Sequence, residues 1–241
     1  MALKLFVDFD GTVTTQDVGN AFFRRFGGPV CDRLVSDYRE GTMSAQECFR
    51  GETAAIGRLP VAEAEAFLRE QQISPGFDRF VEFCRAGGIE FHIVSDGLDY
   101  YVERILSLNG IDGVSVFANR FSLTDTEDGS AAITVSFPFA TAECDRCACC
   151  KRNIILTRAG DDDVIGYIGE GFSDRCAVQY ADIVFAKDEL QTYCQQDNIS
   201  YYLYNDFHDV LARLKVLVAR KNLRKRRRAE NKRREAFMRE A

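Results

Sequence analysis

The stretch Leu3-Lys4-Leu5-Phe6-Val7-Asp8-Phe9-Asp10-Gly11-Thr12 decides the fold, because it has the pattern of a buried strand that ends in a glycine turn. In an extended strand, side chains two residues apart share a face, so the Asp8 and Asp10 carboxylates can converge on one point. A hard cation such as Mg²⁺ would relieve their repulsion and keep positions open for water and a phosphate. The alternative is a surface turn in which Asp10-Gly11 merely ends the strand.

The composition indicates a globular protein with a sizeable core, since 46 % of the 241 residues are hydrophobic. No apolar run approaches the roughly 20 residues that span a bilayer, and the first apolar stretch is too short for a signal peptide. The nine cysteines are an odd number, which fits reduced intracellular thiols better than a disulfide framework. We therefore expect a cytoplasmic protein without a membrane span.

The charge is distributed very unevenly along the chain. The segment Lys215–Ala241 holds twelve of the 31 Lys and Arg residues and three of the 37 Asp and Glu residues. The preceding 214 residues consequently carry 19 basic and 34 acidic side chains, a formal charge of −15. The chain is therefore an acidic body with a basic tail, which we expect to be helical or disordered.

The hydrophobic pattern divides the body into two parts. Residues 15–74 show helical periodicity and little strand character, which indicates a small helical cap domain. Residues 1–14 and 75–214 alternate between strand and helix patterns, which predicts an α/β core with a Rossmann-like parallel sheet covered on both faces. The expected helices include 77–86, 98–108, 151–158 and a helix from Ser173 towards Tyr180. The expected strands include 89–94, 114–117, 121–123, 132–137, 164–168, 183–186 and 201–204.

Polar side chains follow three of the predicted strands directly. Asp8 and Asp10 follow the first strand, Ser95-Asp96-Gly97 the second, and Gly169-Glu170-Gly171-Phe172-Ser173-Asp174 the third. Ligands of open α/β sheets bind beyond the carboxyl ends of the strands, so these residues share a destination. Lys151 adds a cation at a helix start, where free amides also favour an anion. The set suits phosphoryl transfer, although each residue alone could be an ordinary turn or surface residue.

In these motifs the chain resembles the haloacid dehalogenase superfamily, in particular its phosphoserine-phosphatase-like branch. Phe6-Val7-Asp8-Phe9-Asp10-Gly11-Thr12 is similar to the first family motif, Ile93-Val94-Ser95-Asp96-Gly97 to the second, Lys151 to the third and Gly169–Asp174 to the fourth. The resemblance covers the chain to about residue 214. It implies a Mg²⁺-dependent phosphatase that acts on a small phosphorylated metabolite.

The resemblance also implies roles for individual residues. Asp8 would attack phosphorus to give an aspartyl-phosphate, and Asp10 would protonate the leaving oxygen and later activate water. Phosphate binding would involve Gly11, Thr12, Ser95, Asp96, Gly97 and Lys151. Asp8, Asp10 through its carbonyl, Glu170 and Asp174 would hold Mg²⁺. Glu170 departs from the family pattern, which usually has Asp, and either Glu170 still binds the metal or Asp174 takes more of that role.

The substrate stays open between two esters. Asp17 and Arg50 fall where phosphoserine phosphatases read the amino and carboxylate groups of their substrate, although Asp17 could simply cap a helix and Arg50 could be solvated. The run Cys144-Asp145-Arg146-Cys147-Ala148-Cys149-Cys150-Lys151 instead resembles the subgroup that acts on 2-hydroxy-3-keto-5-methylthiopentenyl-1-phosphate.

Two further features allow more than one interpretation. Cys144, Cys147, Cys149 and Cys150 could bind a structural zinc ion, but their spacing is awkward, which favours packed thiols or a redox-sensitive pair. The basic tail could contact nucleic acid or anionic lipid, but a solvated helix is the favoured interpretation. Together with Glu170, the tail motivates an alternative function as a catalytically impaired binding or scaffold protein.

Overall fold

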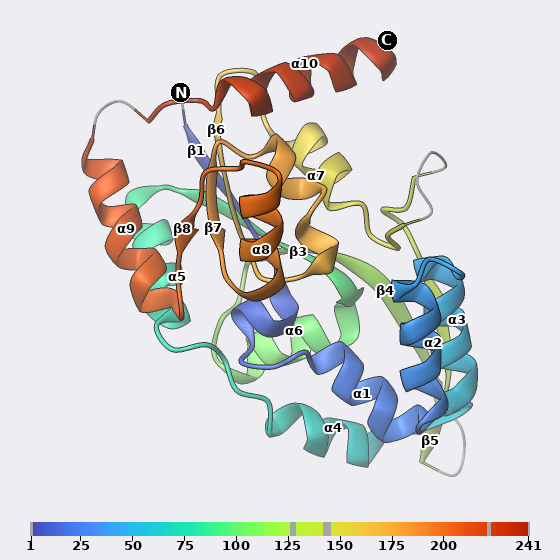
Figure 1. The fold of residues 1–241 in the computed structure, drawn as a ribbon. Helices are drawn as coiled ribbons and strands as arrows, with labels where there is room; N and C mark the ends of the chain where they lie inside the picture. The colour runs from blue at the N-terminus through green and yellow to red at the C-terminus, as the bar shows by residue number, and fades with distance from the viewer. Residues whose placement is uncertain (1, 126–128, 142–145, 221–222, 241) are drawn as a thin grey trace.

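The structure is a computed structural model that describes residues 2–125, 129–141, 146–220 and 223–240 (Figure 1). Its centre is an eight-stranded sheet in the order β2-β5-β4-β3-β1-β6-β7-β8. Six strands are parallel: β1 (Leu3–Val7), β3 (Glu90–Leu98), β4 (Ser115–Asp125), β6 (Val164–Gly169), β7 (Ile183–Ala186) and β8 (Tyr202–Leu203). At one edge, β5 (Ser130–Ser136) pairs antiparallel with β4, and β2 (Arg58–Pro60) pairs antiparallel with β5.

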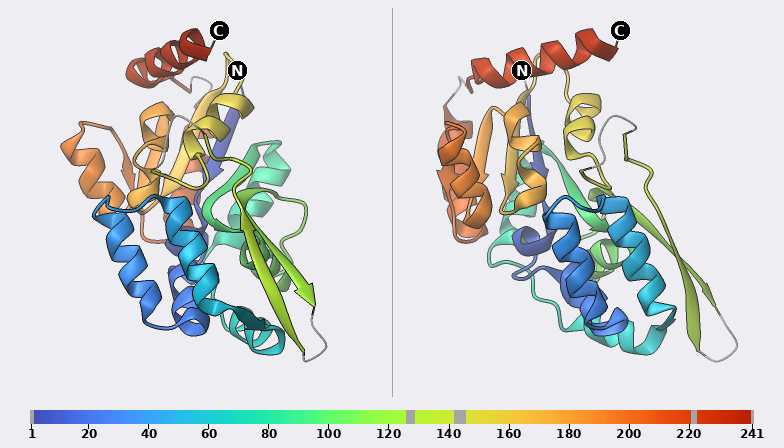
Figure 2. Two further views of the ribbon diagram at one scale, coloured as in Figure 1. Left: turned by 90° about the vertical axis from the view of Figure 1, so that its right-hand side faces the viewer. Right: turned by 45° about the vertical axis from the view of Figure 1, so that its right-hand side comes forward.

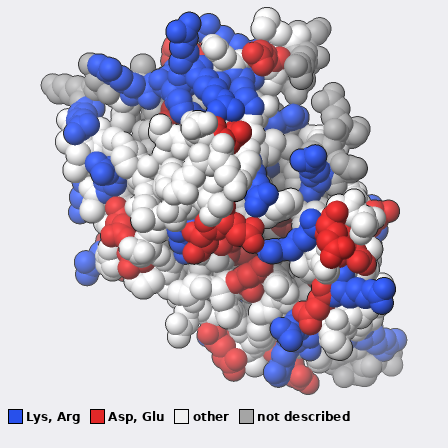
Figure 3. Space-filling view, in the orientation of Figure 1, with Lys and Arg blue, Asp and Glu red and all other residues white. Residues whose placement is uncertain are grey.

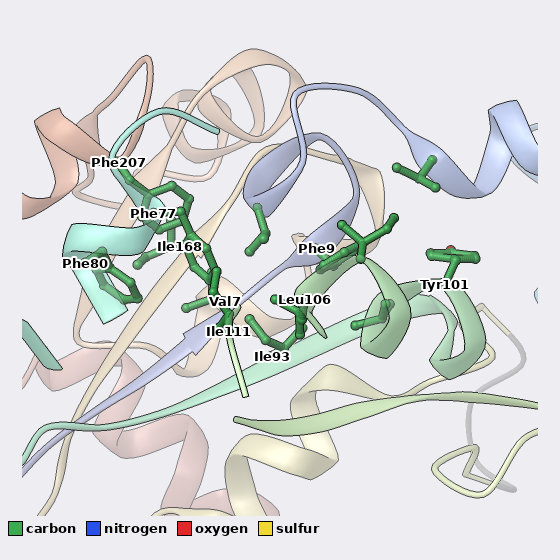
Figure 4. Close-up of a cluster of buried hydrophobic side chains, with 14 of the residues drawn as sticks. Val7, Phe9, Phe77, Phe80, Ile93, Tyr101, Leu106, Ile111, Ile168 and Phe207 are labelled. Carbon is green, nitrogen blue, oxygen red and sulfur yellow. The ribbon is translucent and has the colours of Figure 1, made fainter. Parts of the chain in front are cut away.

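Helices cover both faces of the parallel strands, as the sequence predicted (Figure 1). Leu5 and Val7 of β1 belong to the apolar cluster that α5 (Phe77–Gly87), α6 (Asp99–Leu108) and α9 (Phe207–Ala219) close. Figure 4 shows Val7 and neighbouring aromatic rings in this cluster. Phe6 points to the opposite cluster, which contains side chains of α7 (Lys151–Arg158) and α8 (Asp188–Gln196). This alternation along one strand places β1 in the centre of a two-sided core.

The helices α1 (Val18–Gly27), α2 (Val30–Arg39), α3 (Ala45–Ile56) and α4 (Val61–Arg69) form a unit beside the carboxyl end of the sheet (Figure 2). Thr14 and Ile73 pair as an isolated antiparallel bridge, so the chain leaves and re-enters the core at neighbouring points. A capping box between Ser44 and Glu47 fixes the start of α3. The strand β2 pairs with β5, which ties the helical unit to the β4–β5 hairpin.

Three local predictions differ from the structure. The expected helix from Ser173 to Tyr180 is instead two short 3₁₀ helices, η2 (Phe172–Asp174) and η3 (Ala177–Tyr180), because the chain turns sharply after Asp174. The strands expected at 114–117 and 121–123 are one strand, β4, whose two ends pair with different neighbours. Helix α8 was not predicted, since its sequence has few apolar positions.

The basic tail does not form a simple solvated extension. Helix α9 ends at Ala219. The next helix, α10 (Arg227–Glu240), packs against η3 of the core. The Arg233 guanidinium pairs with Asp182 at 3.0 Å and is 8 % exposed, while Arg226 donates to the Val178 carbonyl at 2.6 Å. Lys and Arg side chains gather at this end of the molecule (Figure 3). Within the described residues, no helix has the length and apolar character needed to cross a bilayer.

Candidate active site

The first site residues lie where β1 ends. The Asp8 amide continues the sheet by donating to the Ile168 carbonyl at 2.9 Å, and the chain then winds into a wide helical turn, η1 (Phe9–Val13). Gly11 has a φ of +69°, which an L side chain rarely adopts. A Cβ at Gly11 would also lie 3.1 Å from Cδ of Glu170. The glycine therefore allows both the turn and the close approach of Glu170.

Asp8 forms a buried charge cluster with residues that lie far away in the sequence. Nζ of Lys151 contacts Asp8 Oδ1 and Asp174 Oδ1, each at 2.6 Å, and Ser173 Oγ at 2.9 Å. The Thr12 hydroxyl donates to the second oxygen, Asp8 Oδ2, at 3.1 Å. Burial, and then Asp174, raise the pKa of Asp8, while Lys151 opposes this shift. The cluster thus holds both oxygens of the Asp8 carboxylate in place.

Both oxygens of Asp174 are occupied by donors of the protein itself. Oδ1 accepts from Lys151 and from the Tyr167 hydroxyl, and Oδ2 accepts from the amides of Glu170 and Gly171 at 2.9 and 3.0 Å. Asp174 is also fully buried. It therefore shapes the turn after β6 and orients Lys151, and its role as a metal ligand stays a prediction.

Asp10 lies beside Asp8 but has separate partners. Its Oδ1 accepts from the amide of Gly19 at 3.0 Å, and its Oδ2 accepts from the hydroxyls of Tyr101 and Ser95 at 3.1 and 3.2 Å. Burial, followed by the charge of Asp17, raises the pKa of Asp10 to about 7, against these hydrogen bonds. At neutral pH this carboxyl group exchanges a proton readily, as a general acid and base must.

The last residues of β3 pack tightly against Asp10. A Cβ at Gly97 would lie 1.7 Å from the Tyr101 hydroxyl oxygen and 2.8 Å from Asp10 Oδ2, so this position excludes a side chain. Asp96 Oδ1 accepts from the amides of Ala148 and Cys149 at 3.0 and 2.8 Å. Burial raises the pKa of Asp96 to about 6. Asp96 therefore ties the end of β3 to the segment that precedes Lys151.

Four of the predicted phosphate-binding groups make bonds within the protein. The Ser95 hydroxyl bonds to Asp10, and the Thr12 hydroxyl bonds to Asp8. The amide of Gly11 donates to the Gln16 carbonyl and the amide of Gly97 to Ser95 Oγ. The structure thus brings these residues together, with the two hydroxyls bonded to Asp8 and Asp10 and the two amides bonded to neighbouring residues.

Glu170 faces a cavity of about 230 Å³ together with Asp8 and Asp10. No hydrogen bond from the described residues reaches its carboxylate, and burial, and then Asp174, raise the pKa of Glu170 to about 7. Asp8 and Glu170 supply hard oxygen atoms to the same cavity. Mg²⁺ commonly takes one or two carboxylates and several waters, so this pair fits it.

No larger cluster of metal ligands exists within the described residues, where no group of three His, Cys, Asp or Glu side chains is placed to hold a metal. The zinc site considered for the cysteine run includes Cys144, which lies outside the described residues. No disulfide joins the described cysteines.

Asp17 and Arg50 lie in different environments. Asp17 caps α1 by accepting from the amide of Asn20 at 2.8 Å, and it also lines the cavity, while its contact with a substrate stays a prediction. Arg50 is exposed, and its guanidinium stacks over the Phe137 ring at 5.2 Å. The cavity-facing residues of α3 follow helical spacing: Ala45, Cys48, Phe49 and Glu52. Arg50 projects from another face of the helix and does not line this cavity, and its role at the substrate stays a prediction.

The sequence analysis missed many side chains of this cavity, and three of them are polar groups that matter for its chemistry. Tyr101 bonds to Asp10, Arg39 lies at the cavity wall and pairs with Glu189 at 3.3 Å, and Glu52 is 4 % exposed. Burial raises the pKa of Glu52 to about 8. Tyr101 could have been found from its place in the first turn after Ser95-Asp96-Gly97. Arg39 and Glu52 carry no such signal, since only the fold of the helical unit brings them to the site.

Comparisons with known proteins agree with this geometry. A family model described as haloacid dehalogenase-like hydrolase matches residues 5–179. A 2-hydroxy-3-keto-5-methylthiopentenyl-1-phosphate phosphatase from Bacillus mycoides is 30 % identical over 224 residues, which cover 90 % of this chain and 98 % of the relative. The enzyme of the same name from Bacillus cereus is 31 % identical over 227 residues, covering 90 % of this chain and 98 % of the relative.

A substrate-bound phosphoserine phosphatase has a similar fold, with a TM-score of 0.64 and 16 % identity over 88 % of this chain and 98 % of that chain. The predicted fold class is thus confirmed. The curated relatives are named phosphatases, which supports the predicted phosphomonoesterase class. The chain belongs to the haloacid dehalogenase-like hydrolase family.

Proposed function

We propose that the protein is a Mg²⁺-dependent phosphomonoesterase that hydrolyses a small metabolite ester through an aspartyl-phosphate on Asp8. The observation that carries the proposal is the position of Asp8, which lines the cavity and lies 2.6 Å from Lys151. Asp10 lies in the same cavity with a pKa raised to about 7 by burial. A nucleophile and a separate acid and base are thus paired in one site.

The two carboxylates divide the reaction into two steps. An Asp8 oxygen forms a bond to phosphorus as the ester P–O bond breaks, and the proton of Asp10 passes to the leaving oxygen. Asp10 then removes a proton from water, whose oxygen attacks the phosphoryl group and releases Asp8 and inorganic phosphate. The Lys151 ammonium balances negative charge on the phosphoryl oxygens. Tyr101 and the Gly19 amide hold Asp10 in place throughout.

Asp8, Glu170 and the Asp10 carbonyl are the groups that would hold Mg²⁺. When bound, the ion supplies positive charge for the phosphoryl oxygens. The longer Glu170 side chain is accommodated because Gly11 leaves room beside it. Asp174 is left to orient Lys151 and the turn, since its oxygens already accept hydrogen bonds from four groups.

The shape of the cavity supports an ester with an apolar end. The helical unit lines it with Phe23, Val35 and Phe49, and Arg50 is not available to bind a substrate carboxylate. The methylthio ester named for the Bacillus relatives has such an end, whereas phosphoserine has two charged groups. We therefore propose 2-hydroxy-3-keto-5-methylthiopentenyl-1-phosphate, or a close analogue, as the substrate and a phosphoserine-like substrate as the competitor.

The first experiment is replacement of Asp8 by Asn. With Mg²⁺ and p-nitrophenyl phosphate, we expect turnover to fall by about three orders of magnitude or more, because the nucleophile is lost. Circular dichroism should show an unchanged fold. Turnover equal to that of the parent protein would contradict the mechanism.

A second experiment compares esters on the parent protein. We expect kcat/KM for the methylthiopentenyl ester to exceed that for phosphoserine by about 100-fold or more, because an unpaired substrate charge is costly in an apolar wall. The reverse order would favour the phosphoserine-like substrate. Absence of turnover with every ester, in the presence of Mg²⁺, would favour the scaffold alternative. That alternative has less support from the tail, since Arg226 and Arg233 bind the core itself.

A further inference from the structure

The segment from Cys147 to Lys151 connects two parts of the active site. Its amides at Ala148 and Cys149 bind Asp96 Oδ1, and its last residue places an ammonium group 2.6 Å from Asp8. Cys150 is the N-cap residue of α7, which Lys151 begins. A change of backbone geometry within Cys147–Lys151 therefore moves both the amides that bind Asp96 and the ammonium group that contacts Asp8.

Two sulfur atoms of this segment are already in contact. A hydrogen bond joins Cys147 and Cys150, and it is the largest cause that lowers the pKa of Cys150 to about 6, against burial. Arg152 and the start of a helix also favour a thiolate at Cys150. Cys147 is partly exposed, whereas Cys150 is 3 % exposed. A reagent from solution can thus reach the Cys147 sulfur, whereas the Cys150 sulfur is buried.

The neighbouring cysteines have different surroundings. Cys149 is completely buried, and its thiol points to the Phe117 carbonyl at 3.7 Å. Burial raises the pKa of Cys149 above its ordinary value. Cys176 is exposed and belongs to another segment, the turn between η2 and η3. Cys147 and Cys150 are therefore the pair whose geometry suits thiol–disulfide exchange.

We propose that Cys147 and Cys150 are a reversible dithiol–disulfide site, oxidised by low-molecular-weight disulfides such as glutathione disulfide, and that its oxidation lowers phosphatase turnover. Cys147 passes its proton to the Cys150 thiolate and attacks one sulfur of glutathione disulfide, and the first glutathione leaves as a thiolate that takes this proton from Cys150. Cys150 then attacks the Cys147 sulfur of the mixed disulfide, and the second glutathione leaves. Two cysteine thiols lose two electrons and two protons, which the two glutathione molecules receive.

Oxidation reaches the active site through the backbone. A disulfide bond is about 2.05 Å long, much shorter than a hydrogen bond between sulfur atoms, so its closure contracts the Cys147–Cys150 turn. The contraction displaces the amides that bind Asp96 and the helix start that positions Lys151. A shift of about 1 Å in a catalytic group can reduce a rate by about 100-fold. The effect on turnover rests on the proposed function, whereas formation of the disulfide does not.

The experiment uses the full chain, fully reduced or incubated with glutathione disulfide, and then alkylated under denaturing conditions. Trypsin cleaves after Arg146 and Lys151, so Cys147, Cys149 and Cys150 leave in one peptide. We expect oxidation to reduce its alkylated cysteines from three to one. Turnover of p-nitrophenyl phosphate with Mg²⁺ should fall by about 10- to 100-fold and return with dithiothreitol.

Three variants separate the pair from other cysteines. Cys147→Ser should retain the turnover of the reduced protein and become insensitive to glutathione disulfide. Cys176→Ser, the matched exposed control, should respond as the parent does, and so should Cys144→Ser. A response that disappears in either control but persists in Cys147→Ser would overturn the assignment.

Two further outcomes decide the remaining parts of the proposal. Failure of the peptide to lose two alkylation sites would refute the disulfide, even in a preparation that hydrolyses no ester. A disulfide that forms without changing turnover would refute its effect on the active site. If no ester is hydrolysed, the proposed function and this effect both fail, while the peptide result still decides the chemical site.

Discussion

The two sides of the cavity differ in how their polar groups are held. On the core side, Asp8, Asp10 and Asp96 each accept at least two hydrogen bonds, from groups that come from separate strands and loops. On the side of the helical unit, the wall combines aromatic rings with the charged residues Arg39 and Glu52. The core side is therefore fixed by a connected network, whereas the other side is fixed by packing.

This difference assigns chemistry and selection to different parts of the molecule. A connected network in a buried site holds catalytic groups in one orientation and is sensitive to the loss of any member. A packed wall of aromatic and charged side chains changes its shape with each side chain and so selects the substrate by size and polarity. Substitutions on the two sides should consequently change different kinetic parameters.

The largest effect is expected for Lys151→Met on the core side. It leaves the buried carboxylates of Asp8 and Asp174 without their cation, so turnover should fall by about 1,000-fold and the free energy of unfolding by about 3–5 kcal/mol. Steady-state kinetics and urea unfolding measure the two effects. Lys4→Met is the matched control, since Lys4 pairs with Glu90 and Asp163 at the other end of β1. An equally large fall in turnover for Lys4→Met would show that the effect is not specific to the cation beside Asp8.

The next effect concerns the pH dependence of stability and comes from Glu52. Its folded pKa of about 8 lies above the ordinary 4.5, so the folded state binds more protons than the unfolded state between these values. Stability should therefore fall as the pH rises through this window and level off above it. Glu52→Gln should remove this loss and be more stable than the parent at pH about 8, by on the order of a few kcal/mol.

Urea unfolding at several pH values measures the difference between Glu52→Gln and the parent. The difference should shrink towards pH about 5, where Glu52 is protonated in the folded protein. Glu63→Gln, at an exposed position of α4, serves as the control and should show no such trend. A constant difference at every pH would mean that the Glu52 carboxyl group is not held neutral by burial.

A smaller effect is expected for Phe49→Ala on the packed wall. Phe49 lines the cavity and contacts the ring of Phe23 at 5.8 Å, so its removal opens the wall. We expect KM for the preferred ester to rise by about tenfold, and kcat to change by less than about twofold. An equal loss in kcat would show that this wall also positions the reacting groups.

The smallest effects compare two arginines of the helical unit. Arg39→Ala removes a cation from the cavity wall and should raise KM for a phosphate ester by about two- to fivefold. Arg50→Ala should leave KM unchanged, because Arg50 stacks on Phe137 outside the cavity. Initial rates over a range of ester concentrations measure both values. A larger rise in KM for Arg50→Ala than for Arg39→Ala would mean that Arg50, and not Arg39, contacts the substrate.

The core and its catalytic residues could be predicted to a large extent because their signals are local. Strand runs followed by Asp8, Ser95 and Glu170 put these residues at one edge of a parallel sheet, and the sheet order agrees. The prediction that Ser95 and Thr12 bind phosphate depended on where hydroxyl groups point. In the structure the Thr12 hydroxyl bonds to Asp8 and the Ser95 hydroxyl to Asp10, and their contact with phosphate stays a prediction.

The helical unit was predicted less well because its contribution depends on helix rotation. Sequence periodicity indicated helices there, but the choice between Phe49 and Arg50 as the cavity residue depends on how α3 packs against β5 and α1. Adjacent residues on a helix point about 100° apart, so a small error in orientation exchanges them. The basic tail was predicted less well for the same reason. Its sequence indicated solvated arginines, whereas in the structure Arg226 bonds to η3 and Arg233 pairs with Asp182.

By itself the sequence determined the α/β class, the motif residues and the charge asymmetry, because apolar periodicity and residues at strand ends are local properties of the chain. The tertiary structure decided which groups surround each carboxylate, that Glu170 faces the cavity while Asp174 is occupied, and that Arg39 and Glu52 belong to the wall. Hydrogen bonding and burial depend on partners that can be more than 100 residues apart, as Asp8 and Lys151 are. Only the folded chain brings such partners into contact.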